Sequence, residues 1–216
     1  MSVDCPNPGE NCCYTNLSDF TGAADCVVDF SHHAATDALL SYCVGRNLPA
    51  VIATTGQTGQ EKAAIAQAAK QIPVFFSANY SLGIAVLAEL AQKAAAMFPD
   101  ADIEIVETHH NQKLDVPSGT ALLLANRIRV VRPEAELVIG RHENGKRAKN
   151  EIGVHSLRLG SETGTHEILI STGSETLTLT HRAENRALFA EGALRAAGWL
   201  MDKPAGLYAM RDLIGG

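Results

Sequence analysis

Short apolar segments alternate with longer amphipathic segments along the first hundred residues. Three apolar runs rich in β-branched and aromatic residues have strand character: CVVDF (26–30), AVIAT (50–54) and PVFF (73–76). Three segments repeat apolar positions at helical spacing: HAATDALLSYCVGR (33–46), EKAAIAQAAKQI (61–72) and LGIAVLAELAQKAAAMF (82–98). Strands that alternate with helices predict a parallel sheet covered by helices, of the α/β class.

The pattern changes in the second half of the chain. Four strands are predicted with turn signals but no crossover helix between the last three: DIEIVETHH (102–110), EIGVHSLRL (151–159), HEILIST (166–172) and TLTLTHRA (176–183). Successive strands of this kind favour an antiparallel sheet, and hence a second region of α+β character. The segment at 186–203 is a predicted helix.

Composition excludes several classes of function. The 216 residues suffice for one large or two small domains, and 46% are hydrophobic. A net charge of −6 leaves no broad basic face for nucleic acid. No apolar run has the length of a membrane span, and the first twenty residues lack a signal-peptide pattern. We therefore expect a cytoplasmic protein that acts on a small molecule, without a nucleic-acid or membrane partner.

Cysteine usage agrees with a reducing compartment. All five cysteines lie in the first fifth of the chain, an odd number that suits free thiols. Cys5, Cys12 and Cys13 are spaced poorly for a zinc site. A metal site around Glu107, His109 and His110 is disfavoured too, because the later histidines form no HxH or HxxxH pair. No metal is expected.

Candidate chemistry concentrates in ETHHNQKLDVPSGTALLLA (107–125). Histidine side chains titrate near neutrality and lysine side chains are cations, so His109, His110 or Lys113 could donate a proton. At most one histidine faces a given site if the strand continues through both, whereas both can reach it if the strand ends there. An ordinary solvated loop is the alternative.

A helix start follows directly. In PSGT, the free N–H groups of the first helical turn could hold a carboxylate or phosphate beside Ser118 and Gly119. The alternative is an ordinary helix start with Ser118 as N-cap. Two further loops, ATTGQTG and SANYS, follow predicted strands at the end where α/β sheets bind ligands. A plain turn at Gly56 and an Asx turn at Asn79 are the alternatives there.

Taken together, these motifs resemble one enzyme family. VVDFS, ATTG, SANYSLGIAVL, VETHHNQKLDVPSGTALLLA, IGVHSLR, HRAENRALFAEGALRAAGWL and GLYAMRDL look like dihydrodipicolinate reductases in order and spacing, over residues 20–214. The resemblance implies reduction of 4-hydroxy-tetrahydrodipicolinate, a cyclic dicarboxylate, with NADH or NADPH in lysine and diaminopimelate biosynthesis. It also implies a Rossmann-like parallel domain, an α+β domain with a mixed or antiparallel sheet, and a homotetramer joined through these second sheets.

The resemblance also assigns residues. It makes His109 and Lys113 catalytic, and places His110, Ser118, Gly119 and Thr120 on the substrate carboxylates. The residues that it places at the cofactor are Asp4, Phe30, Ser31, Ala53, Thr54, Thr55, Ser77, Ala78, Asn79 and Tyr80. The implied domains are 1–80 with 186–216 for the dinucleotide, and 81–185 for substrate binding and tetramer formation. Arg186 would lie at the return crossing, or form a structural ion pair.

One departure from the family pattern bears on the cofactor. The family begins with a strand and a GxxGxxG turn for the pyrophosphate, and neither occurs in this sequence. The resemblance places Asp4 at the end of the second family strand. Three explanations of the missing segment are open: Met1 is an internal methionine, the sequence is a fragment, or the protein is a shortened homologue. The alternative function is therefore a homologue that binds dicarboxylate and oligomerises without productive cofactor binding. A smaller departure is Ala53, where the family usually has glycine.

Overall fold

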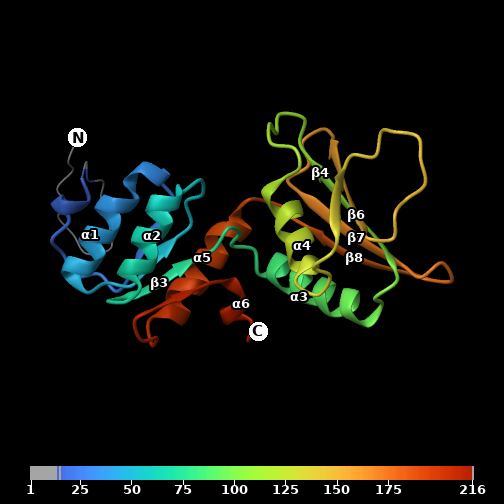
Figure 1. Cartoon of the computed structure of the whole chain (residues 1–216). Coiled ribbons are helices and arrows are strands. Elements are labelled where there is room, and N and C mark those ends of the chain that lie inside the picture. Colours follow the sequence, from blue (N-terminus) through green and yellow to red (C-terminus); the bar gives the residue numbers. More distant parts are fainter. Residues whose placement is uncertain (1–13, 15, 216) are drawn as a thin grey trace. The chain divides into compact units, whose positions relative to one another are not determined.

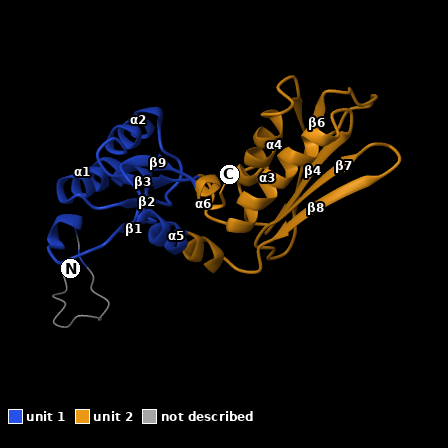
Figure 2. Ribbon diagram, turned by 90° about the horizontal axis from the view of Figure 1, so that it is seen from below, with its two compact units in different colours: residues 1–77, 193–209 blue, residues 78–192, 210–216 orange. Residues whose placement is uncertain are grey.

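The chain forms two compact units in a computed structural model that describes residues 14 and 16–215. Unit 1 comprises residues 1–77 and 193–209, and unit 2 comprises residues 78–192 and 210–216 (Figure 2). The division falls inside one helix, α5 (Ala187–Leu200), so the chain returns from unit 2 to unit 1 along this helix.

Unit 1 is built around a parallel sheet (Figure 1). Its elements are η1 (Leu17–Asp19), β1 (Val27–Asp29), η2 (His33–Ala35), α1 (Thr36–Arg46), β2 (Ala50–Ile52), α2 (Gly59–Ala68), β3 (Pro73–Phe76), part of α5, and β9 (Gly206–Tyr208). The strand order is β1-β2-β3-β9, and every neighbouring pair is parallel. The predicted α/β character of the first part of the chain is thus confirmed.

Helices cover both faces of this sheet. Val74 of β3 packs in a core cluster with residues of α1 and α2. The next residue, Phe75, points to the other face, as alternation along a strand requires, and its ring meets Trp199 of α5 at 6.1 Å. A capping box starts α2: Thr58 Oγ1 accepts from the N–H of Glu61, and Glu61 Oε2 accepts from the N–H of Thr58.

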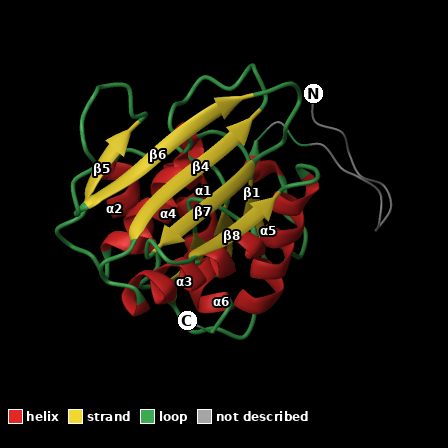
Figure 3. Cartoon of the chain, turned by 90° about the vertical axis from the view of Figure 1, so that its right-hand side faces the viewer, coloured by secondary structure: helices red, strands yellow, loops and turns green. Residues whose placement is uncertain are grey.

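Unit 2 contains a five-stranded sheet with two helices on one face (Figure 3). Its elements are α3 (Leu82–Met97), β4 (Asp102–His109), α4 (Gly119–Arg129), β5 (Glu136–Ile139), β6 (Glu151–Arg158), β7 (Thr165–Ser171), β8 (Thr176–Arg182), part of α5, and α6 (Met210–Leu213). Its core combines apolar residues of α3 and α4 with the facing side chains of β4, β6 and β7.

The order of this sheet is β5-β6-β4-β7-β8. β5 pairs in parallel with β6, and β6 pairs in parallel with β4. β7 pairs in antiparallel orientation with both β4 and β8. The prediction of antiparallel pairing between successive strands was therefore wrong for β6, because β4 lies between β6 and β7. Two short strands, β5 and β9, were not predicted, since their three or four residues carry little alternation.

No helix among the described residues is long and apolar enough to cross a membrane. Arg186, for which a structural ion pair was one alternative, is exposed and forms no ion pair with any other described residue.

Candidate active site

Strand β4 carries polar chemistry into the core of unit 2. Its inward positions alternate with outward ones, so Ile103 and Ile105 are followed on the same face by Glu107 and His109. The strand ends at His109, which leaves His110 as the first residue of the following loop. Because the strand ends at His109, strand alternation does not force His109 and His110 to opposite faces, and both can reach one site.

Glu107 is fully buried and accepts hydrogen bonds from several elements. Its two carboxylate oxygens receive the guanidinium of Arg158 from β6 at 3.1 Å. Oε1 also accepts from the backbone N–H of Ser118 at 3.2 Å, and Oε2 faces Nδ1 of His109 in a short contact. Burial alone would raise the pKa of this carboxyl, but the bonds from His109 and Arg158 outweigh it and lower the pKa to about 2. Glu107 is thus a carboxylate at neutral pH.

His109 is held on two sides. Nδ1 faces Glu107, and the ring is stacked edge-on against His166 with 5.1 Å between centroids. Nε2 makes no hydrogen bond to any described residue, and it lies beside the buried Gly164. A Cβ added to Gly164 would be 3.0 Å from Nε2 and 3.2 Å from Cδ2 of His109. The side chain is therefore locked, with Nε2 as the nitrogen left for a ligand.

Replacement of Gly164 by alanine is expected to disturb His109 specifically. The new methyl group would press on the imidazole, which Glu107 prevents from rotating away. We expect turnover to fall about tenfold or more, because a small displacement of the predicted proton donor is costly. The free energy of unfolding should fall by about 1–3 kcal/mol from the overpacking. Steady-state kinetics beside a thermal melt checks this. Alanine at Gly145, where no described atom lies within 4 Å of the added Cβ, is the control; equal turnover in both variants would contradict the account.

Lys113 lies in the loop after β4. Its Nζ forms an ion pair with Asp115 Oδ1 at 2.7 Å, and the lysine side chain is about one-fifth exposed. The loop is anchored to the connection between β6 and β7, because Asn111 N–H donates to Gly160 C=O at 3.1 Å. Partial burial would raise the pKa of Asp115, but the Lys113 ammonium outweighs it and the pKa is lowered. A cationic donor group thus lies on the same loop as His110.

The N-terminus of α4 closes the site from another side. Ser118 is its N-cap, with Oγ accepting from the N–H of Ala121 at 3.2 Å, so the predicted cap is confirmed. The same Oγ lies 3.2 Å from Nε2 of His166. Thr120 Oγ1 accepts from Nδ2 of Asn79 at 2.9 Å, which joins the SANYS loop to this helix. Gly119 is exposed and carries one of the first N–H groups of the helix.

His166 is a buried neutral imidazole beside these groups. It is 4% exposed, and its Nδ1 has no hydrogen-bond partner among the described residues. Burial and the neighbouring His109 lower its pKa to about 4. A proton on this ring would therefore place an uncompensated charge inside the fold.

His166 makes a pH-dependent contribution to stability. Because its pKa falls from 6.5 to about 4 on folding, stability is full above pH 6.5 and declines as the pH drops from 6.5 to about 4. The loss in the free energy of unfolding should approach about 3 kcal/mol. Urea unfolding at several pH values measures it, with His166→Gln as the variant that should flatten the slope. An unchanged slope would count against this assignment; Glu107 acts in a lower window, from 4.5 to about 2.

The residues predicted for the cofactor fall in both units. Phe30, Ser31, Ala53, Thr54, Thr55 and Ser77 belong to unit 1, and Ala78, Asn79 and Tyr80 belong to unit 2. Asp4 lies outside the described residues. In unit 1 the loops after β1 and β2 are polar: Asp29 Oδ1 accepts from the N–H and Oγ of Ser31 at 3.0 and 2.5 Å. Thr54 Oγ1 is buried without a described partner, which fits a polar ligand at this loop.

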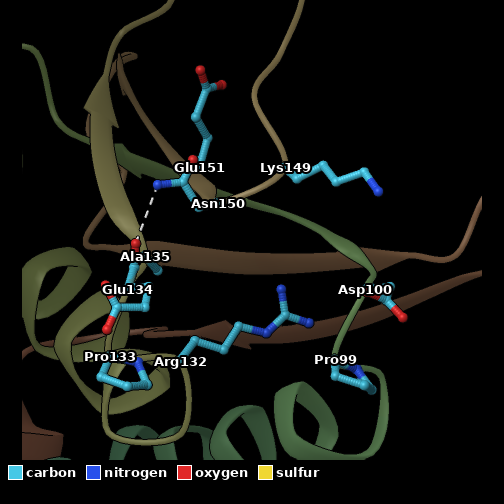
Figure 4. A pocket seen from close by; sticks show the side chains of 9 residues that line it. All are labelled: Pro99, Asp100, Arg132, Pro133, Glu134, Ala135, Lys149, Asn150 and Glu151. Atoms are coloured by element: carbon cyan, nitrogen blue, oxygen red, sulfur yellow. Dashed lines mark hydrogen bonds between the residues drawn. The ribbon is translucent and has the colours of Figure 1, made fainter.

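Unit 2 also contains a cavity of about 470 Å³ without candidate residues (Figure 4). Arg132 lies along it and donates to the carbonyl groups of Ala101 at 2.8 Å and of Phe98, at the end of α3. Nδ2 of Asn150 donates a hydrogen bond to the backbone carbonyl of Glu134 at 3.2 Å. The arginine is therefore occupied in closing the end of α3.

Three site residues were not given a role by the sequence. Glu107 had been considered only as a metal ligand, and Arg158 had not been considered. His166 had been included only among the later histidines that form no HxH or HxxxH pair. No group of three or more histidine, cysteine, aspartate or glutamate side chains among the described residues is arranged to hold a metal ion. One signal was available: a glutamate on the inward, otherwise apolar face of β4. Arg158 on β6 and His166 on β7 reach the site through the strand register, which pairs His109 with Arg158 and Glu107 with His166.

The fold and this cluster define a two-unit α/β chain, with a parallel sheet in one unit and a cluster of titratable side chains around His109 in the other. The family profile described as dihydrodipicolinate reductase, N-terminus, matches residues 7–80, and the C-terminus profile matches residues 83–214. The chain belongs to the dihydrodipicolinate reductase family.

Individual relatives carry the name of the same family. The chain is 45% identical over 203 residues to 4-hydroxy-tetrahydrodipicolinate reductase of Caldanaerobacter subterraneus subsp. tengcongensis, covering 93% of this chain and 81% of the relative. Identity to the enzyme of the same name from Clostridium tetani is 43%, covering 91% and 78%. Among solved structures, dipicolinate-bound dihydrodipicolinate reductase from Paenisporosarcina sp. TG-14 is similar, with a TM-score of 0.72, 30% identity and coverage of 86% and 71%.

Proposed function

We propose that this chain catalyses the NADH- or NADPH-dependent reduction of 4-hydroxy-tetrahydrodipicolinate to tetrahydrodipicolinate, with the 4-hydroxyl group released as water, in lysine and diaminopimelate biosynthesis. The observation that carries the proposal is the match of both family profiles, which together extend over residues 7–80 and 83–214. The cluster of His109, Lys113 and the α4 N-terminus in unit 2 supports it, because it combines a proton donor with an anion-binding helix start.

The substrate carboxylates would bind at the start of α4. The N–H groups at Gly119 and Thr120 belong to the first helical turn, where backbone donors and the helix dipole favour an anion. The Asp115 carboxylate already interacts with the Gly119 N–H, so a substrate carboxylate would have to share or replace it there. His110 and Ser118 complete the proposed carboxylate contacts. The Ser118 N–H is already taken by Glu107, so the serine contributes mainly by fixing the helix start.

Proton delivery falls to Lys113 and His109. Lys113 pairs with Asp115 at 2.7 Å, and an incoming carboxylate substrate offers the ammonium group a second anionic partner. His109 presents Nε2, because Nδ1 is engaged by Glu107. The proposed dinucleotide contacts in unit 1 are Phe30, Ser31, Thr54 and Thr55, and a nicotinamide held there would supply the hydride.

We also propose a homotetramer assembled through the sheet of unit 2. Figure 3 shows its strands with α3 and α4 on one face and no described helix on the other. Leu157 on that open face is 51% exposed. This open face is the surface through which copies of the chain would associate. Sedimentation equilibrium should give four times the chain mass.

The proposed compartment is the cytoplasm. Cys26 and Cys43 are free thiols, as expected under reducing conditions. Burial raises the pKa of Cys26 to about 11 and that of Cys43 to about 12, so both are unreactive at neutral pH.

The proposal is tested by following absorbance at 340 nm with the purified chain, NADH or NADPH, and enzymatically generated substrate. We expect substrate-dependent loss of absorbance with at least one dinucleotide. Calorimetry with pyridine-2,6-dicarboxylate and with each dinucleotide accompanies the assay. Binding of the dicarboxylate without saturable dinucleotide binding or turnover would contradict the proposal, and would favour a dicarboxylate-binding, oligomerising homologue instead.

A further inference from the structure

The environment of Glu107 differs from that of an ordinary buried ion pair. Its side chain is fully buried, yet it joins three separate elements: β4 through His109, β6 through Arg158, and the start of α4 through the N–H of Ser118. A buried carboxylate is costly unless its oxygens are satisfied. Here the bonds reach both the proposed proton donor and the proposed carboxylate-binding helix.

The ionised state of Glu107 fixes the proton on His109. A carboxylate only accepts hydrogen bonds, so Nδ1 of the facing imidazole must be the donor. A neutral His109 therefore has its proton on Nδ1 and a lone pair on Nε2, and the protonated ring has a transferable proton on Nε2 alone. Glu107 thus determines which nitrogen exchanges protons with a ligand.

We infer that Glu107 is a positioning residue, which orients His109 through Nδ1 and ties it to the N-terminus of α4. The expected effect of Glu107 on kcat rests on the proposed function. Arg158 has a supporting part: it shares the Glu107 carboxylate and donates to the carbonyl of Asp115 at 2.7 Å, next to the Lys113 loop. Through His109, Arg158 and the Ser118 N–H, this one buried carboxylate links the end of β4, the Lys113 loop and the start of α4.

The test variant is Glu107→Gln. Its amide has nearly the same shape, and its oxygen can still accept from Arg158 or Ser118, but its NH₂ group donates toward His109 Nδ1. The proton of neutral His109 should then move to Nε2. We expect kcat to fall about 100-fold, because an amide NH₂ facing Nδ1 no longer stabilises the protonated ring that donates from Nε2. The KM for substrate should change less than about threefold, because Glu107 does not contact the substrate. Glu107→Asp should recover part of kcat.

Histidine ¹⁵N NMR separates positioning from mere stability. In the unmodified protein, neutral His109 should show a protonated Nδ1 and an unprotonated Nε2; the reverse pattern would overturn the inference even if Glu107→Gln fails to fold. Glu104→Gln is the matched control on the same strand, since Glu104 Oε2 faces Nε2 of His155 at 2.8 Å. It should change the His155 signals and leave those of His109 in place.

The outcomes also separate this inference from the proposed function. Absence of turnover in the unmodified protein contradicts the reductase proposal, whereas the His109 NMR pattern still decides whether Glu107 orients the ring. A folded Glu107→Gln variant with the altered pattern and undiminished kcat would overturn the positioning role. The altered pattern together with reduced kcat and retained KM would support it.

Discussion

Substitution of Lys113 by alanine is expected to lower turnover by about 10²- to 10⁴-fold, the usual range for loss of a general acid. The Lys113 side chain is about one-fifth exposed and lies on the loop that begins at His110. Its removal should leave dinucleotide affinity unchanged, because the lysine is assigned to protonation of the substrate. Steady-state kinetics and dinucleotide titration of the same preparation measure both effects.

Lys146→Ala is the control for this variant, since Lys146 is an exposed lysine in the connection between β5 and β6. It should have the kcat of the unmodified protein. If Lys113→Ala retained full turnover, Lys113 would not be the proton donor. If it lost dinucleotide affinity in proportion to turnover, the lysine would act in cofactor binding.

Alanine at Gly192 is expected to lower the free energy of unfolding by about 1–3 kcal/mol. Gly192 is a buried residue of α5, and an added Cβ would lie 1.8 Å from the backbone oxygen of Tyr80. Such an overlap with backbone cannot be relieved by a side-chain rotation, so the helix and the loop before α3 must separate. The effect arises within unit 2, which contains both residues.

Gly198→Ala in the same helix is the matched comparison. No described atom lies within 4 Å of its added Cβ, and the position is exposed, so the substitution should stabilise the protein by about 0.4–1 kcal/mol through reduced chain entropy. Urea unfolding of both variants gives the two changes. Effects of the same sign and size would show that the close approach of Gly192 to Tyr80 is not a constraint on the fold.

Local patterns in the sequence predicted most of the elements, because apolar periodicity depends on neighbouring residues alone. PVFF is β3 without change, and the segment at 82–98 is α3 to within one residue. The pairing of the strands was not predictable in the same way. β6 follows β5 in the chain and lies beside it, yet its other neighbour is β4, more than forty residues earlier.

The same distinction holds for the candidate site. His109, Lys113 and Ser118 are close in sequence, so a single motif predicted them together. Arg158 and His166 come from strands that reach β4 only through the register of the folded sheet. Whether Asn79 binds the cofactor stays a prediction; its hydrogen bond to Thr120 within unit 2 was not foreseen, because it joins residues forty-one positions apart.

The most direct test of the reductase assignment uses NADPH or NADH carrying deuterium at the transferable position of the nicotinamide. The purified chain is incubated with this cofactor and 4-hydroxy-tetrahydrodipicolinate, and the product is examined by mass spectrometry. We expect tetrahydrodipicolinate that contains one deuterium from the cofactor. Product without the label, or no product with either deuterated dinucleotide, would contradict it.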